Sequence, residues 1–250
     1  MNVAIAVFLF SAAALGGAIN SVAGGGSFVA FPALLFAGVP AIPANTTNTV
    51  ALWPGSAASV VAYRRELGEV RRELLPLGVA ALAGGLLGSV LLLRTSEAAF
   101  VLLIPWLLLF ATVLFSFGGA LRARLRDVTA PLPIAAVAQF CISVYGGYFG
   151  GGMGIMMLAI LSLLGMSDIH RMNALKTALA TLVNGIAVVT FVIARAVYWG
   201  PGAVMIAGGV LGGYAGAAAA RRTPPAYVRR LVLAIAWSMT AYFFVRTYRR

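Results

Sequence analysis

The sequence predicts an all-α protein that crosses a membrane several times and consists of two inverted repeats. Of the 250 residues, 62% are hydrophobic and only 10% are charged, whereas a water-soluble domain carries about 25% charged residues. Apolar runs of near-spanning length recur along the whole chain, without the alternation that is typical of membrane β-strands. A glycine triplet followed by a short apolar run occurs once in each half of the chain.

Ten helices are expected from these apolar runs, and eight of them approach spanning length. The ten segments are 3–23, 28–37, 45–63, 74–93, 98–118, 132–149, 153–164, 172–194, 201–219 and 228–246. A helix of 12 residues is about 18 Å long, whereas the hydrocarbon core is about 30 Å thick. Segments 28–37 and 153–164 are therefore predicted to be half-helices or re-entrant arms. Segment 3–23 follows no basic region and shows no cleavage site, so it is interpreted as a retained helix and not as a signal peptide.

The arginines predict the orientation of the chain. When loop 64–72 is placed in the cytoplasm and sides alternate from there, twelve arginines fall inside and five outside. Cytoplasmic loops of membrane proteins carry such an excess. Topology and anionic lipid headgroups thus account for the net charge of +12, and no nucleic-acid partner is predicted.

The same count predicts where the repeats begin and end. Each half contains five segments, and an odd number inverts the second half relative to the first. We expect a first membrane repeat at 1–118, a basic cytoplasmic linker at 119–130 and a second membrane repeat at 131–250.

The two glycine triplets, at 24–26 and 150–152, lie just before the short helices. Glycine permits positive φ and close approach of a ligand, and irregular backbone at membrane depth is tolerated only where it is buried in protein or lines a wet cavity. The first N–H groups of each short helix would point into the break, where unpaired donors and the helix dipole favour an anion. Alternatively, the glycines only let helices pack closely. Their duplication ahead of short helices favours a substrate site.

Polar side chains near the breaks extend the predicted site. Lys176 is the only lysine in the chain and falls within a membrane segment, where a charge is a functional hypothesis by default. It would complement an anion, or it would snorkel to the cytoplasmic interface. Thr47 and Asn48 occupy the matching stretch of the first half, with hydrogen bonding between helices as the alternative. The predicted substrate-binding residues are Gly24, Gly25, Gly26, Ser27, Thr47, Asn48, Gly150, Gly151, Gly152, Met153, Asn173, Lys176 and Thr177.

Other polar residues receive more modest roles. Ser27 is expected at an N-cap position, and Asp168 is expected to cap the helix that follows it. A second group of polar residues would line the same cavity or bond neighbouring helices. This group consists of Asn20, Gln139, Ser143 and Asn184. The spans contain no Asp, Glu or His and a single cysteine, so neither a metal site, a cofactor nor a catalytic residue is predicted.

The two blocks resemble a known family. The first block consists of residues 24–27, Phe28, Pro32, Gly38, Pro40, Thr47 and Asn48. The second consists of residues 147–158, Gly165, Asn173, Lys176 and Thr177. Together they resemble the TauE/SafE family of sulfite exporters, also called toluene-sulfonate uptake permeases. The resemblance implies a secondary transporter of the inner or plasma membrane for small anions, chiefly sulfite, organosulfonates and related sulfur or carboxylate compounds.

The resulting prediction is a multi-pass membrane transporter that moves a small anion by alternating access. The alternatives are a passive anion channel built from the same helix ends, a membrane-embedded enzyme and a non-transporting assembly factor. The absence of an acid/base pair within the spans disfavours the enzyme. The predicted partners are the anion and the lipid bilayer. Coupling to a proton or another ion, the identity of the anion, the direction of transport and the oligomeric state are not predicted.

Overall fold

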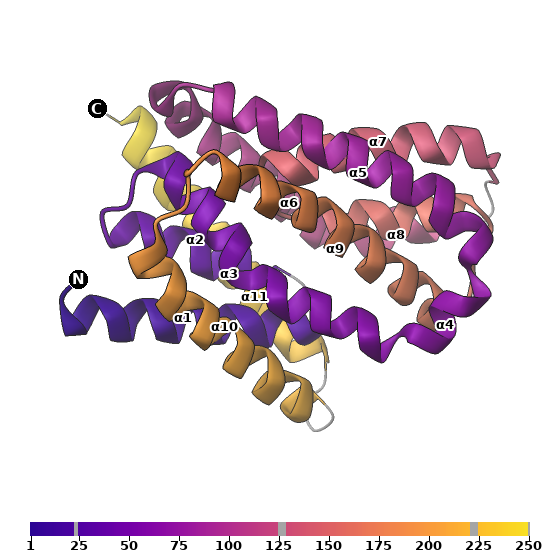
Figure 1. The fold of residues 1–250 in the computed structure, drawn as a ribbon, viewed down its shortest axis with the longest axis horizontal. Helices are drawn as coiled ribbons and strands as arrows, with labels where there is room; N and C mark the ends of the chain where they lie inside the picture. Colours follow the sequence, from indigo (N-terminus) through magenta and orange to yellow (C-terminus); the bar gives the residue numbers. More distant parts are fainter. Residues whose placement is uncertain (23–24, 125–128, 221–224, 250) are drawn as a thin grey trace.

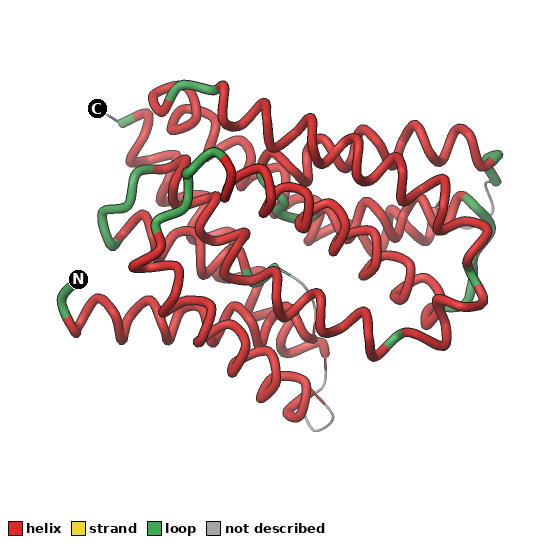
Figure 2. Tube along the Cα trace, in the orientation of Figure 1, coloured by secondary structure: helices red, strands yellow, loops and turns green. Residues whose placement is uncertain are grey.

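The computed structural model describes residues 1–22, 25–124, 129–220 and 225–249, and all regular structure in these ranges is helical (Figure 2). The described residues form eleven helices (Figure 1). The helices are α1 (Val3–Val22), α2 (Ser27–Phe36), α3 (Ala41–Ala62), α4 (Arg64–Glu69), α5 (Arg71–Arg94), α6 (Glu97–Arg124), α7 (Leu132–Tyr148), α8 (Met153–Leu163), α9 (Ile169–Ile193), α10 (Trp199–Ala220) and α11 (Pro225–Tyr248). Ten of them match the predicted segments. The eleventh, α4, lies in the predicted loop 64–72 and is too short to show an apolar period.

Five helices of the described residues, α1, α5, α6, α9 and α11, are long and apolar enough to cross a membrane. Eight spanning helices were expected, and five helices have the length and composition of a span. Two of the other three differ for local reasons, because α7 has 17 residues and α3 carries a polar stretch at residues 45–49. Most of these polar residues are buried, so α3 turns its polar face toward the protein interior. In the third, α10, the structure describes the side chains of residues 199–215 only.

The short helices α2 and α8 each form a hairpin with the helix before them. Figure 1 shows α1 and α2 at the end of the molecule that carries both termini, and α7 and α8 toward the opposite end. Both short helices end at a glycine with positive φ, Gly38 (82°) and Gly165 (76°). The next N–H then bonds back into the helix, from Val39 to Leu34 O (3.0 Å) and from Met166 to Leu161 O (3.2 Å). The two short helices therefore end with the same type of C-cap.

Glycines bring two pairs of helices into backbone contact, α1 with α10 and α5 with α7. A Cβ added at Gly212 would lie 2.5 Å from the carbonyl carbon of Ala14, and one added at Gly88 would lie 2.9 Å from that of Val144. Small residues allow such close packing of membrane helices. The first helix of each predicted half thus packs on the third long helix of the other half.

Two hydrogen bonds join helices at the centre of the molecule. The Trp53 Nε1–H of α3 donates to the Thr181 carbonyl of α9 (3.1 Å), and the hydroxyls of Thr112 on α6 and Thr240 on α11 lie 3.1 Å apart. The two partners are 128 residues apart in both cases. Both hydrogen bonds therefore join the first predicted half to the second with the same separation in sequence.

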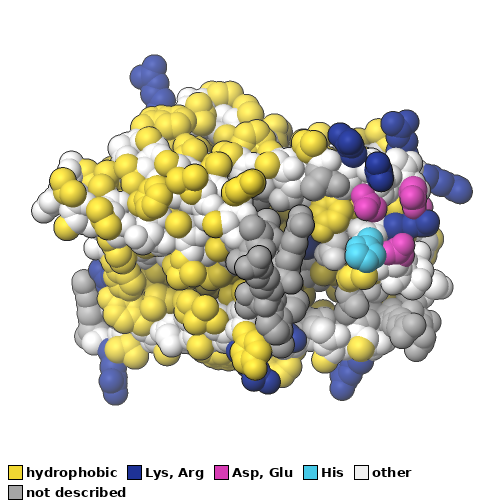
Figure 3. Space-filling model, turned by 90° about the horizontal axis from the view of Figure 1, so that it is seen from below, with side chains coloured by type: hydrophobic (Ala, Val, Ile, Leu, Met, Phe, Trp, Pro, Cys, Tyr) yellow, Lys and Arg dark blue, Asp and Glu magenta, His cyan; other side chains and the backbone are white. Residues whose placement is uncertain are grey.

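The outer surface of the molecule is strongly apolar. Exposed side chains include Val7, Leu75, Val79, Trp106 and Phe117. Figure 3 shows hydrophobic side chains over most of one half of the visible face, with acidic side chains and the imidazole at the opposite end. A water-soluble monomer rarely exposes apolar patches of this extent, so the surface fits contact with lipid tails.

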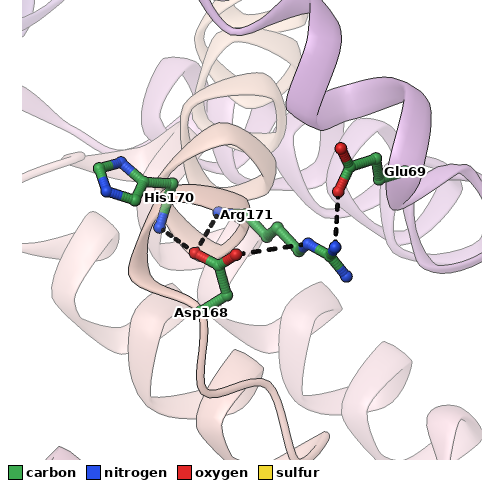
Figure 4. Close-up of polar contacts among 4 residues, drawn as sticks. All are labelled: Glu69, Asp168, His170 and Arg171. Atoms are coloured by element: carbon green, nitrogen blue, oxygen red, sulfur yellow. Dashed lines mark hydrogen bonds and ion pairs between the residues drawn. The ribbon is translucent and has the colours of Figure 1, made fainter.

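The charged end holds the start of α9 against α4 (Figure 4). The Asp168 side chain accepts the backbone N–H groups of His170 (2.8 Å) and Arg171 (3.4 Å), which confirms the predicted cap. These hydrogen bonds, the one from His170 above all, lower the pKa of Asp168. The Arg171 side chain pairs with Glu69 of α4 (2.7 Å) and with Asp168 (3.4 Å). All three side chains are about half exposed, so the pairs add little stability.

Candidate functional site

Both glycine breaks open onto one cavity with a volume of about 380 Å³. The first break contributes Gly25 and Ser27, the second contributes residues 150–152, and α9 contributes Lys176. The cavity is therefore built from both halves of the chain. It lies where α2 and α8 begin.

The structure places nine of the thirteen predicted site residues in the cavity lining. These nine are Gly25, Ser27, Gly150, Gly151, Gly152, Met153, Asn173, Lys176 and Thr177. Gly24 lies outside the described residues. The remaining three, Gly26, Thr47 and Asn48, are buried or packed beside the lining and do not form part of it.

Hydrogen bonds explain where Thr47 and Asn48 lie. The Thr47 hydroxyl accepts the backbone N–H of Tyr198 (3.0 Å), so it ties α3 to the loop between α9 and α10. The Asn48 Nδ2 donates to the Ser27 hydroxyl (3.2 Å), and its Oδ1 has no hydrogen-bond partner among the described residues. Thr47 therefore forms a hydrogen bond between segments of the fold, which was the predicted alternative to substrate binding. Asn48 is linked to the cavity only through its hydrogen bond to Ser27.

At the first break, a side chain accepts one of the backbone N–H groups. Gly25 has a φ of 93°, and the Gly26 N–H donates to Asn20 Oδ1 at 2.7 Å. The predicted N-cap at Ser27 is wrong. The N-cap is Gly26, which offers no capping side chain, and Ser27 is the first helical residue. The Ser27 hydroxyl is engaged by Asn48 instead.

The second break keeps its amides open. Gly150 and Gly152 have positive φ values of 83° and 77°. The Tyr145 hydroxyl donates to the Gly151 carbonyl at 2.7 Å. Within the described ranges, no acceptor lies in hydrogen-bond geometry on the N–H groups of Gly151, Gly152 or Gly154. These donors surround the start of α8, the end of a helix that favours negative charge.

Lys176 brings a cation to the same place. Its Nζ donates to Asn173 Oδ1 at 3.2 Å. Its stem lies over Gly154, where an added Cβ would be 3.5 Å from the Lys176 Cδ. Among the described residues that line the cavity, Lys176 is the only one with a charged side chain, and none is acidic.

Several lining residues were not predicted from the sequence. Ser56, Ser59 and Tyr63 come from the second half of α3. Their spacing of three and four places them on one helix face, and this polar stripe in an apolar segment was the available signal. Three aromatic rings also line the cavity and carry no such signal. They are Phe28, Phe115 and Phe149.

The second group of predicted residues divides in two. Asn20 and Asn184 line the cavity. Gln139 and Ser143 bond to each other at 2.9 Å and are fully buried away from it. In the part of the chain that the structure describes, no three His, Cys, Asp or Glu side chains come together as metal ligands would.

Comparison with known proteins gives consistent matches over most of the chain. A family model described as "Sulfite exporter TauE/SafE" matches residues 9–243. A "Probable membrane transporter protein" of Haemophilus influenzae is 27% identical over 247 residues, covering 96% of this chain and 95% of the relative. A "Probable membrane transporter protein ORF9" of Sinorhizobium sp is 30% identical over 215 residues, covering 84% and 80%. A "Probable membrane transporter protein YfcA" of Escherichia coli K12 is 27% identical over 240 residues, covering 93% and 87%. No solved structure matches the chain.

Proposed function

Because the chain belongs to the sulfite exporter TauE/SafE family, we propose that it is a secondary transporter of the cell membrane that carries a small anion by alternating access. Sulfite, an organosulfonate or a related sulfur or carboxylate compound is the proposed substrate. The observation that carries the proposal is that both glycine breaks open onto one cavity in which Lys176 is the only charged side chain among the described lining residues.

The chemistry of the cavity supports an anion. The open N–H groups at the start of α8 donate hydrogen bonds and carry the positive end of the helix dipole. The Lys176 ammonium adds a full positive charge, and no carboxylate among the lining residues opposes it. A cationic substrate would find no counter-charge there.

The size of the cavity supports a small substrate. Its volume of about 380 Å³ is near the lower end of the roughly 300–1,000 Å³ that small-molecule sites occupy. The serine hydroxyls and the aromatic rings of the lining would contact the remainder of an organic anion. A compact ion such as sulfite would enter with water.

The repeated contacts support two inverted repeats, with the proposed boundaries 1–118 and 131–250 and the linker 119–130 between them. Packing of α1 on α10 is repeated by α7 on α5, and packing of α3 on α10 is repeated by α9 on α5. The contacts of Trp53 with Thr181 and of Thr112 with Thr240 join positions separated by the same 128 residues. Alternating access by rocking of one repeat against the other is the motion that such an arrangement permits.

The route of a coupled proton follows from the same lining. A carboxylate relay is not available among the described lining residues. A proton would have to travel on the substrate itself, as hydrogensulfite, because sulfite is the conjugate base of this weak acid, or on Lys176.

Binding of an anion panel to the purified protein tests the proposal. Thermal unfolding is measured with sulfite, methanesulfonate, acetate and, as a cationic control, tetramethylammonium. An anion at 100 times its Kd adds about 2.7 kcal/mol of stability, so at least one anion should raise the Tm while the cation should not. Stabilisation by the cation alone would refute the proposal.

A further inference from the structure

We infer that the anion is held at the second glycine break alone, and that Tyr145 is a positioning residue that aims the Gly152 N–H at it. The inference rests on the proposed function and makes it more specific, because the sequence predicted that backbone N–H groups of both breaks hold the anion. It follows from three differences between the breaks.

The first difference is that one donor of the first break is already used, so that only the N–H groups of Gly25 and Ser27 are without an acceptor among the described residues. The Gly26 N–H gives its hydrogen to Asn20 Oδ1 at 2.7 Å. Next to it, Asn48 Oδ1 is an acceptor that has no partner among the described residues and is almost fully buried. Fewer N–H groups are therefore free at the first break than at the second, where those of Gly151, Gly152 and Gly154 have no acceptor among the described residues.

The second difference is that a hydroxyl fixes the orientation of the second break. The described peptide bonds include no cis bond, and the C=O and N–H of a trans peptide point in opposite directions. The Tyr145 hydroxyl holds the Gly151 carbonyl at 2.7 Å. The N–H of the same peptide unit, which belongs to Gly152, therefore points away from Tyr145 and stays free of the described acceptors.

The position of the Tyr145 hydroxyl is itself fixed by packing. Its ring makes edge-on contacts with Phe110 (centroids 5.2 Å apart) and Phe149 (6.4 Å). The Tyr145 backbone carbonyl also accepts the N–H groups of Phe149 (2.9 Å) and Gly150 (3.3 Å). One residue thus holds the break by its side chain and by its backbone.

The third difference is charge. Lys176 and Asn48 are separated by the same 128 residues as the contact pairs at the centre of the molecule. Each reaches the first turn of a short helix, Lys176 over Gly154 and Asn48 onto Ser27. The cation and the free N–H groups therefore coincide at the second break, whereas the first break has an amide in place of the ammonium.

Sulfite binding to the purified wild-type protein and two tyrosine variants tests the role of Tyr145. Tyr145→Phe removes only the hydroxyl that holds Gly151. Tyr148→Phe is the matched control, because it removes a hydroxyl on the same helix that contacts Thr95 at 3.2 Å and does not line the cavity. Loss of one hydrogen bond predicts a sulfite Kd about three- to tenfold higher in Tyr145→Phe and unchanged in Tyr148→Phe. The Tm without sulfite controls for unfolding, because a merely structural hydroxyl would lower it without changing the Kd.

Hydrogen exchange of the unmodified protein tests the location of the anion without any variant. Sulfite should slow amide exchange in the peptides that cover residues 149–155 and leave those that cover residues 25–33 unchanged. Equal protection of both breaks, or a Kd in Tyr145→Phe equal to that of wild type, would overturn the inference while leaving anion transport intact. If wild type binds neither sulfite, methanesulfonate nor acetate, the proposed function fails, and the inference fails with it.

Discussion

Substitution of the contact glycines tests the packing that positions the breaks. In Gly88→Ala the new Cβ would lie 2.9 Å from the Val144 carbonyl carbon and 2.9 Å from the Tyr148 nitrogen. In Gly212→Ala it would lie 2.5 Å from the Ala14 Cα and carbonyl carbon. The carbonyl oxygens of Val144 and Ala14 would be closer still. Ordinary contacts begin at 3.4 Å, so the helices must separate by roughly 1–1.5 Å if they move along the contact. All of these atoms belong to backbone and cannot rotate aside.

The expected cost follows from two opposing terms. Overpacking costs about 1–3 kcal/mol, and replacing glycine by alanine within a helix returns about 1 kcal/mol. The matched control on α5 is Gly78→Ala, whose Cβ would be 3.4 Å from the end of the flexible Leu182 side chain. The control on α10 is Gly200→Ala, where no atom lies within 4 Å.

The assay is thermal unfolding of detergent-purified protein, followed by size-exclusion chromatography. Gly88→Ala and Gly212→Ala should both lower the Tm by a similar amount, because the two contacts correspond in the two halves. The controls should equal or exceed wild type. A Tm for either contact variant that matches its control would refute the backbone contact between these helices.

Three further substitutions test the site and one helix cap. Lys176→Met keeps the stem over Gly154 and removes the charge. We expect sulfite affinity to fall roughly 10- to 100-fold, as loss of a charged hydrogen bond implies, without a drop in the Tm of the anion-free protein. Unchanged affinity would mean that Lys176 only snorkels. Gly152→Ala places a side chain at a φ of 77° and 3.3 Å from the Ala111 Cα. The strained conformation costs about 1–2 kcal/mol, so the Tm should fall. A Tm equal to that of wild type would contradict the left-handed turn. Asp168 has a pKa below its ordinary value because α9 backbone N–H groups bond to the carboxylate. The contribution of this carboxylate to protein stability is therefore present at neutral pH and is lost as the pH falls through the lowered pKa. The Tm difference between wild type and Asp168→Asn should shrink below about pH 4, and a constant difference would contradict the cap.

The sequence predicts the helices well because the environment of a membrane helix leaves a simple pattern. Ten apolar runs coincide with helices, and the largest difference is in α6, which continues to Arg124, six residues into the predicted linker. Helix α4 is missed because its six residues are mostly charged, and its stability comes from contact with α5 and α9 and not from its own period. Helix α3 differs from the predicted apolar span because burial in protein replaces contact with lipid for its polar stretch.

The site is predicted less completely because partners distant in sequence decide where a side chain points. The glycine breaks were found from their duplication, and both line the cavity. The pattern gives no sign that Thr47 bonds to Tyr198, 151 residues away. Asn20 and Tyr145 each lie only six residues before the glycine that they bond, but the pattern does not show that one accepts from an N–H group and the other donates to a carbonyl. Two breaks that look alike in sequence therefore have unlike hydrogen bonding in the fold.

Counterflow in proteoliposomes tests carriage of an anion by this cavity most directly. Vesicles that contain the purified protein are loaded with unlabelled sulfite, and uptake of external ³⁵S-sulfite is followed in wild type and in Lys176→Met. We expect internal sulfite to accelerate uptake by wild type, because a carrier returns faster when loaded, and we expect Lys176→Met to require much higher sulfite for the same rate. Uptake that internal sulfite does not accelerate would identify a channel, and the absence of any protein-dependent anion flux would contradict transport altogether.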